Sequence, residues 1–131
     1  MKRARLFFIL VFGLFVTQPA NAERYTVLVK SEPSEFVPAD LSILVNDIVV
    51  WTWISGAHTV TADDGSFDSG IKTKPARYRR AFFEPGDVWY YCTLHGSPGG
   101  VGHAGVIRVN TRDWDDNDSD FEPEPGPVPR R

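Results

Sequence analysis

Short apolar segments separated by turn-forming residues occupy most of the chain between residues 25 and 109. The segments are rich in Val, Ile, Trp, Tyr and Phe, and Gly, Pro, Asn and Asp interrupt them at short intervals. Beyond the N-terminal residues, no stretch of eleven or more residues has a helical apolar period. We expect strands at Tyr25–Val29, Leu41–Val45, Asp47–Trp53, His58–Ala62, Arg79–Phe83, Asp87–Cys92 and Val106–Val109. Their number and spacing predict an all-β fold, a small β-sandwich.

Two turns can be predicted from their residue types. The pair Asn46–Asp47 lies between two expected strands and supplies a residue that tolerates a positive φ. The segment Glu84–Asp87 has Pro and Gly at its two central positions, which is typical of a type II turn. Because this connection is short, we expect Ala81–Phe83 and Val88–Tyr91 to pair as an antiparallel hairpin. The register of that hairpin would determine the face on which Cys92 emerges.

The N-terminal residues have the pattern of an export signal. Lys2, Arg3 and Arg5 precede an apolar run over residues 6–16, and Ala20-Asn21-Ala22 is a small-residue sequence that a signal peptidase accepts. A helix that spans a membrane needs about 20 apolar residues, so an uncleaved anchor is the weaker interpretation. We predict cleavage after Ala22, and therefore an exported, for example periplasmic, protein without stable membrane insertion.

Removal of the signal peptide, residues 1–22, leaves enough chain for one compact domain but not for two. The signal carries three of the fourteen Lys and Arg residues and none of the seventeen Asp and Glu residues. The mature chain therefore has eleven basic and seventeen acidic residues, which is a formal charge of −6. An acidic chain argues against nucleic acid as a partner. We expect a single domain over residues 23–110, in a monomer.

The composition changes after residue 110. Seven carboxylates fall within residues 113–124, four prolines lie between residues 123 and 129, and few apolar residues accompany them. Repulsion between like charges and a low apolar content predict a disordered acidic and Pro-rich tail over residues 111–131. The tail is either solvated or a docking segment for a basic partner.

A basic run precedes the last expected strands. It consists of Lys72, Lys74, Arg77, Arg79 and Arg80. Alternation along a strand would distribute these side chains over two faces, so a solvated face is the simpler interpretation. A docking patch for an acidic partner, or for the chain's own tail, is the alternative.

The chain has a single cysteine, Cys92, whereas exported proteins usually carry paired cysteines. No disulfide can form within the chain. In an oxidising compartment a lone thiol is open to oxidation unless it is buried or bound to a metal. Burial as a small apolar side chain is the simpler interpretation, and metal binding requires further ligands close by.

Such ligands are present in the sequence. Cys92 and His95 lie three positions apart, where an expected strand enters a loop rich in Gly and Pro. The flexible glycines of this loop allow the chain to bring His103 within reach of the same point. His58 opens another expected strand, so all three histidines of the chain are candidate ligands.

A thiolate with two imidazoles is the equatorial ligand set of blue copper sites, which also have a weak axial ligand. Cysteine and histidine also bind zinc, but structural zinc sites in small exported domains usually use more than one cysteine. Copper is therefore favoured over zinc. A third interpretation has no metal, with a buried thiol and with histidines that merely occupy loops.

Three segments of the chain together resemble one known family. They are Phe36-Val37-Pro38 with Leu41–Trp51, His58–Gly70, and Phe83–Gly96. Across nearly the whole mature domain they are similar to the cupredoxins, the copper proteins of the plastocyanin and azurin type. This resemblance implies a two-sheet Greek-key sandwich that carries single electrons. It also implies one copper ion per chain, with His58, Cys92 and His95 as its equatorial ligands.

The chain departs from the family pattern at one position. His103 stands where the family ordinarily has a methionine as the axial ligand, and the only Met of the chain is Met1. A nitrogen ligand binds copper more strongly than a thioether, so we expect a greener or redder site with a lower reduction potential. Alternatively, His103 points to solvent, and its imidazole then titrates near the free pKa of about 6.5.

These observations favour a function in electron transfer between redox partner proteins rather than catalysis. The imidazole of His95, in the Gly and Pro-rich loop, is the expected exit for the electron. The sequence contains no defensible Ser-His-Asp set, phosphate loop or spaced carboxylate pair. Two alternatives remain, a copper carrier or storage protein that exchanges its metal readily, and a small copper enzyme whose altered axial position admits a small molecule.

Overall fold

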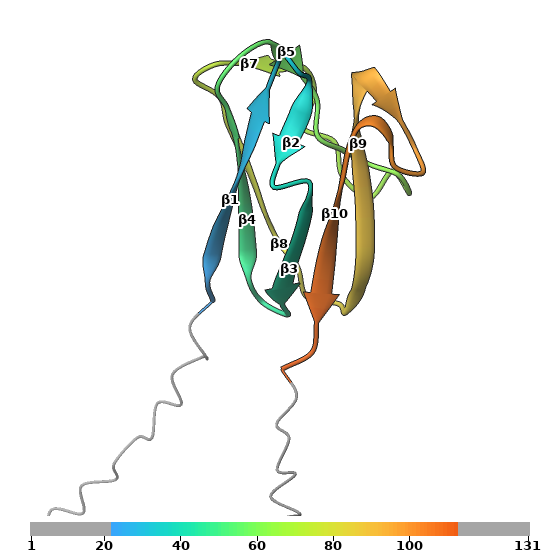
Figure 1. The fold of residues 1–131 in the computed structure, drawn as a ribbon. Coiled ribbons are helices and arrows are strands. Elements are labelled where there is room, and N and C mark those ends of the chain that lie inside the picture. The colour runs from blue at the N-terminus through green and yellow to red at the C-terminus, as the bar shows by residue number, and fades with distance from the viewer. Residues whose placement is uncertain (1–21, 113–131) are drawn as a thin grey trace, which may run out of the picture.

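The computed structural model describes residues 22–112 as a β-sandwich without helices (Figure 1). The first sheet has the strand order β2-β1-β4-β8, formed by Glu35–Val37, Arg24–Lys30, Ile48–Trp53 and Arg77–Ala81. The second sheet has the order β3-β10-β9-β6, formed by Asp40–Leu44, Val101–Asn110, Gly86–Ser97 and Thr61–Ala62. A two-stranded sheet pairs β5, Ala57–His58, with β7, Lys72–Thr73. The expected all-β sandwich is confirmed.

The core lies between the two large sheets and follows from the alternation of side chains along the strands. In β4 every second residue is buried, so Val49, Trp51 and Trp53 face inward. The ring of Trp51 meets the edge of the Tyr90 ring from β9, with ring centroids 5.4 Å apart. Cys92 is two positions beyond Tyr90 on β9 and faces the same core. This alternation places the thiol inside the sandwich.

Strand positions agree with the expectation for most of the chain, with three differences. Two short strands, β2 and β7, were not expected. The expected strand at His58–Ala62 is divided into β5 and β6, because its first part pairs with β7 and its second part with β9. Strand β9 continues to Ser97, well into the loop rich in Gly and Pro, and its partner β10 begins at Val101 rather than Val106, so that it includes His103.

The predicted hairpin between β8 and β9 is wrong. Strand β8 pairs with β4 in the first sheet, whereas β9 pairs with β10 and β6 in the second. The segment between them therefore crosses from one sheet to the other. Two backbone hydrogen bonds hold the residue after β8 in the first sheet. They run from Asn46 N to Phe82 O at 2.7 Å and from Phe82 N to Asp47 O at 3.1 Å. A short Pro-Gly connection allows either topology, and these long-range bonds decide it.

The turn at Asn46 is confirmed. Asn46 has a φ of 75°, and the backbone of Asp47 closes the turn by donating to Leu44 O at 3.1 Å. This turn takes the chain from β3 in the second sheet to β4 in the first.

Different strand ends and turns lie at the two ends of the sandwich (Figure 1). The start of β1 and the end of β10 lie at one end, together with the turn at Asn46. The tip of the β9–β10 hairpin, β5 and β7 lie at the other end. Apart from residues 22, 111 and 112, the predicted signal and tail lie outside the described residues and stay predictions. Within residues 22–112 we find no helix that is long and apolar enough to cross a membrane.

Candidate metal centre

The structure brings all four predicted ligands together. The donor atoms of His58, Cys92, His95 and His103 all lie within 4.8 Å of one another. His58 ends β5, Cys92 and His95 lie on β9, and His103 lies on β10. Strand β5 and the β9–β10 hairpin, which are distant in sequence, therefore meet at one point, between the sheets at the end of the sandwich that holds the β9–β10 tip.

Three of the donor atoms form a triangle of the size that a metal ion requires. The His58 Nδ1 and His95 Nδ1 atoms are 3.1 Å apart, and they lie 3.8 Å and 3.6 Å from Cys92 Sγ. A point equidistant from the three atoms lies about 2.0 Å from each, close to the roughly 2.0 Å and 2.3 Å of metal–nitrogen and metal–sulfur bonds. The spacing fits a single ion in the plane of the three donors.

His103 is buried against this triangle, so the solvent-facing alternative is excluded. Its side chain is 1% exposed, and its ring centroid lies 4.7 Å from that of His58 and 4.1 Å from that of Phe36. Neither ring nitrogen has a hydrogen-bond partner within residues 22–112. A buried polar group without a partner is costly, and a metal ion would satisfy one of the two nitrogens.

Burial also changes how His103 titrates. Loss of hydration, followed by the positive charges of protonated His58 and His95, lowers the pKa of His103 to about 4. The metal-free imidazole therefore does not titrate near 6.5 as expected for an unligated histidine. Titration near neutral pH cannot distinguish a bound from an unbound His103.

The backbone around His103 on β10 is tightly packed. A β-bulge lies between Gly102 and Ala104, so the pairing of β10 with β9 shifts at His103. A Cβ atom added to Gly96 would lie 2.5 Å from His103 O and 2.8 Å from Val101 O. The backbone of β9 therefore approaches that of β10 so closely that only glycine fits at position 96.

His58 is oriented by groups that the sequence did not reveal as part of the site. The Ser31 hydroxyl lies 2.9 Å from His58 Nε2, and Ser55 Oγ accepts from the Ser31 backbone at 2.9 Å. The indole of Trp53 donates to His58 O at 3.1 Å. With Nε2 bonded to Ser31, the Nδ1 atom is the one that faces Cys92. Burial, and then the charge of His95, lower the pKa of His58, which favours the neutral imidazole that binds metals.

Cys92 is held by the residue that follows His58. The backbone of Thr59 donates to Cys92 Sγ at 3.4 Å. The Thr59 hydroxyl accepts from the backbone of Thr93 at 2.9 Å and donates to the Thr93 hydroxyl at 3.2 Å. These bonds tie the His58 segment to the Cys92 strand. The sequence could have indicated Thr59, because it is adjacent to a candidate ligand. Nothing in the sequence indicated Ser31, which lies 27 residues before His58.

His95 is the exposed member of the four, as expected for the residue that connects the cluster to the surface. His58, Cys92 and His103 are buried. Leu94, which precedes His95, and Val101, across the hairpin, are also largely exposed. Access to the donors therefore runs through the His95 imidazole.

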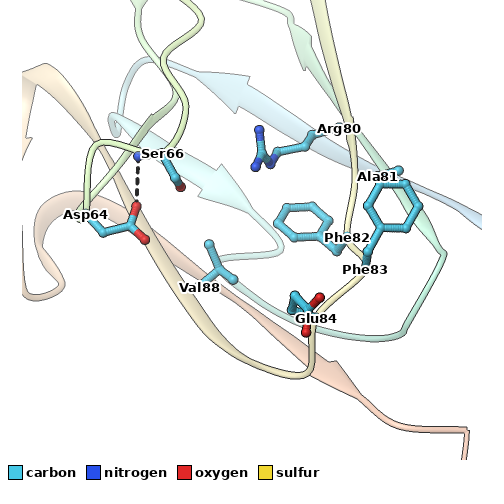
Figure 2. A pocket seen from close by; sticks show the side chains of 8 residues that line it. All are labelled: Asp64, Ser66, Arg80, Ala81, Phe82, Phe83, Glu84 and Val88. Atoms are coloured by element: carbon cyan, nitrogen blue, oxygen red, sulfur yellow. Dashed lines mark hydrogen bonds between the residues drawn. The ribbon is translucent and has the colours of Figure 1, made fainter.

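The described residues form a surface pocket of about 390 Å³ (Figure 2). It is lined by Asp64, Ser66, Arg80, Ala81, Phe82, Phe83, Glu84 and Val88, and none of these is a candidate ligand. The Arg80 guanidinium lies over the Phe67 ring at 4.7 Å from its centroid. Arg77 and Arg79 lie on the same strand and are exposed. The basic run is thus spread over β7, β8 and the segment between them.

No protein-family model matches the chain, and no curated protein matches it. Solved structures do match. A protein described as a novel purple cupredoxin from Nitrosopumilus maritimus is 23% identical with a TM-score of 0.56, over 69% of this chain and 100% of that one. The reduced Cu(I) form of an amicyanin mutant is 20% identical with a TM-score of 0.55, over 72% of this chain and 87% of that one.

A pseudoazurin from Sinorhizobium meliltoi is 25% identical with a TM-score of 0.52, over 67% of this chain and 74% of that one. These neighbours are cupredoxins. The chain therefore has the cupredoxin fold, as the sequence resemblance implied. Within that fold its cluster of His58, Cys92, His95 and His103 could hold one copper ion.

Proposed function

We propose that this chain binds one copper ion through His58, Cys92, His95 and His103 and carries single electrons between exported redox partners. The observation that carries the proposal is the convergence of the four donor atoms within 4.8 Å. Bound copper would supply a couple between Cu(I) and Cu(II). The chain's own residues hold the ligands in place and keep water from them.

The rigidity of the donors supports electron transfer over catalysis. Electron transfer favours a ligand geometry that changes little between two oxidation states, whereas a catalytic metal needs an open position. Here Ser31, Thr59 and Trp53 bond the segments that carry His58 and Cys92. Three of the four donors are buried, so the cluster leaves little access for a substrate.

The surface around His95 supports contact with a partner protein. The imidazole of His95 is exposed, and Leu94 and Val101 expose 49% and 58% of their surface. An apolar surface of this kind suits brief docking, because it can be covered and released without breaking strong ion pairs. We propose that the electron enters and leaves through His95.

His103 gives the proposed centre its particular character. Its two unpartnered nitrogens make it the proposed axial ligand, in place of a thioether. A stronger axial nitrogen stabilises Cu(II) and shifts the site from trigonal toward tetrahedral geometry. We therefore expect a green, red or purple protein with a lower reduction potential than a blue copper protein with axial methionine.

Optical and EPR spectra of the copper-loaded protein test the proposal. Wild type is compared with His103→Met, which restores a thioether, and with His103→Ala, which leaves no axial side chain. We expect intense visible absorption from the thiolate in wild type, and a shift toward a blue spectrum with a higher potential in His103→Met. An ordinary blue spectrum unchanged in His103→Ala would refute axial ligation, and failure to take up copper would refute the function.

Four further measurements separate electron transfer from the alternatives. Fast, reversible one-electron exchange at an electrode would support the proposal that the protein is an electron carrier. Rapid loss of copper to a chelator would instead indicate a metal carrier or storage protein. Spectral shifts on addition of small anions would indicate an open coordination position and a copper enzyme. Preferential uptake of zinc from an equimolar mixture would indicate a structural metal site.

A further inference from the structure

A buried carboxylate lies at the end of the sandwich opposite the donor cluster. The side chain of Asp47 is 1% exposed. Its Oδ1 atom accepts from the Glu23 backbone nitrogen at 3.0 Å and from Arg112 Nη2 at 3.0 Å, and its Oδ2 atom accepts from the Leu44 backbone at 2.9 Å. Residue 23 is the first residue after the predicted signal peptide.

The Glu23 nitrogen is held at this carboxylate by strand pairing. The Glu23 carbonyl accepts from the Ile48 backbone at 2.8 Å, and the parallel register of β1 on β4 begins with Arg24 opposite Ile48. Ile48 follows Asp47 directly in the chain. The pairing of the two strands therefore fixes the Glu23 nitrogen beside the Asp47 carboxylate, while Ala22 is exposed.

We propose that the bond between Ala22 and Glu23 is a processing site and that its cleavage creates a partly buried ion pair with the carboxylate of Asp47. The new α-ammonium of Glu23 binds the carboxylate of Asp47 in place of the backbone amide. The proposal rests on the predicted export signal and not on the proposed copper function.

The chemistry is the hydrolysis of one amide bond by a peptidase that removes export signals. Water supplies the hydroxyl group that converts the Ala22 carbonyl carbon to a carboxylate. The nitrogen of Glu23 becomes the leaving amine, and it takes up a proton to form an ammonium group. The amine remains on the folding chain and the carboxylate leaves with residues 1–22.

The charges around Asp47 favour this outcome. In the uncleaved chain Asp47 pairs with one cation, Arg112, while a second carboxylate, that of Glu23, bonds Tyr25, whose pKa is affected by all three charges. The hydrogen bond from Tyr25 to Glu23 Oε2, at 2.9 Å, raises the pKa of Tyr25, and the negative charges of Glu23 and Asp47 raise it further. The α-ammonium adds a second cation and balances the group. A buried carboxylate gains more from a charged donor than from an amide.

The ion pair predicts a distinct pH dependence. An unperturbed α-amino group has a pKa of about 7.7 to 8.0, and a carboxylate partner raises it. The extra stability is therefore present below that range and is lost as the pH rises through the raised pKa. The groups that titrate nearby are Glu23, Tyr25, Asp47 and Arg112, and the raised pKa of Tyr25 keeps its phenol neutral over this range. Phe82, which bonds the Asp47 backbone, does not titrate.

Intact mass and N-terminal sequencing of the exported protein test the processing site. Expression of the full chain with its own signal should yield a protein that begins at Glu23. A protein that keeps Met1, or that begins at another residue, would overturn the proposal. This result is independent of copper, because it is read from the covalent chain.

The ion pair is tested with two chains that differ by one residue, 23–131 and 22–131. Each is released from a removable tag so that its N-terminus is authentic. The chain that begins at Glu23 should have an unfolding equilibrium constant about tenfold smaller near pH 7, which corresponds to a pKa shift of about one unit. This advantage should disappear as the pH is raised toward 10. Identical pH profiles for the two chains would overturn the ion pair.

Asp47→Asn in both chains provides the matched control. The substitution keeps an acceptor for the Glu23 nitrogen but removes the negative charge, so the difference between the two chains should vanish. A difference that persists in Asp47→Asn would show that the ammonium acts through another group and would overturn the assignment. NMR titration of the Glu23 α-proton in the native 23–131 chain gives the pKa directly, even if the variant fails to fold.

Discussion

Both ends of the sandwich bury a polar side chain, but the two side chains differ in whether their polar atoms have hydrogen-bond partners. At one end both oxygens of the Asp47 carboxylate accept hydrogen bonds, including one from the cation Arg112. At the other end both nitrogens of the buried His103 ring lack partners within the described chain. A buried polar group whose hydrogen bonds are made is compatible with a stable fold, whereas one without partners is costly, and beside three other metal-binding side chains a metal ion would satisfy it.

The difference distinguishes a structural site from a functional site. The Asp47 group is built from backbone donors and one arginine, so its contribution is already present in the folded chain. The donor cluster brings three imidazoles and a thiol together. Burial, and then the charges of the neighbouring imidazoles, lower the pKa values of His58 and His103. The following predictions test this contrast, from the largest expected effect to the smallest.

Cys92→Ala should abolish the proposed copper centre. Removal of the thiolate eliminates the soft ligand, so the intense visible absorption should disappear and copper affinity should fall by orders of magnitude. The free energy of unfolding of the metal-free protein should fall by only about 1 to 3 kcal/mol, which is the cost of a small core cavity. Visible absorption that survives the substitution would show that Cys92 does not bind the metal.

Asp47→Ala should have the largest effect at the other end. It leaves Arg112 and two backbone donors without their acceptor, and breaking a buried pair in this way costs about 3 to 5 kcal/mol. Urea denaturation measures the loss, and the copper spectrum should not change. Asp40→Ala is the control, because Asp40 makes an exposed pair with Arg108 and its removal should cost much less. Equal losses in the two variants would contradict the contrast.

Gly96→Ala should disturb the donor cluster through its backbone. The added methyl group would clash with the carbonyls of Val101 and His103, at a cost of about 1 to 3 kcal/mol. The copper spectrum should shift because His103 moves. Gly99→Ala is the control: it has open space but a φ of 84°, so it should reduce stability without a spectral change. A wild-type spectrum in Gly96→Ala would show that the close approach does not position His103.

His103→Met should have the smallest effect on the metal-free protein, and of the opposite sign. It replaces two unsatisfied buried nitrogens by an apolar side chain, which we expect to stabilise the metal-free fold by about 1 kcal/mol. The same denaturation experiment as for Asp47→Ala measures it at neutral pH. A loss of stability as large as that of Asp47→Ala would show that His103 is a structural residue after all.

Much of the candidate site could be predicted because it depends on local features. Cys92 and His95 lie three positions apart at the end of a strand, and alternation along that strand turns Cys92 into the core. All three histidines were candidate ligands from their positions, and the resemblance to cupredoxins implied the equatorial role of His58 and the axial place of His103. The solitary thiol could be narrowed from composition to two interpretations, burial or metal binding, because in a chain predicted to be exported only these protect it.

Other features could not be predicted from neighbouring residues. The Pro-Gly connection after Phe83 indicated a hairpin, yet it crosses between the sheets, because Phe82 bonds Asn46 and Asp47 and so extends the pairing of β8 with β4 in the first sheet. Ser31 reaches His58 only because β1 and β4 pair in parallel.

Local patterns thus determined most of the strands, the turn at Asn46 and the choice of the four candidate ligands of this protein. The tertiary structure alone decided which strands pair, that His103 is buried without a partner, and that Asp47 meets the Glu23 nitrogen. The physical reason is that periodicity and turn chemistry act over a few residues. Burial and hydrogen bonding between distant strands depend instead on how the whole chain packs.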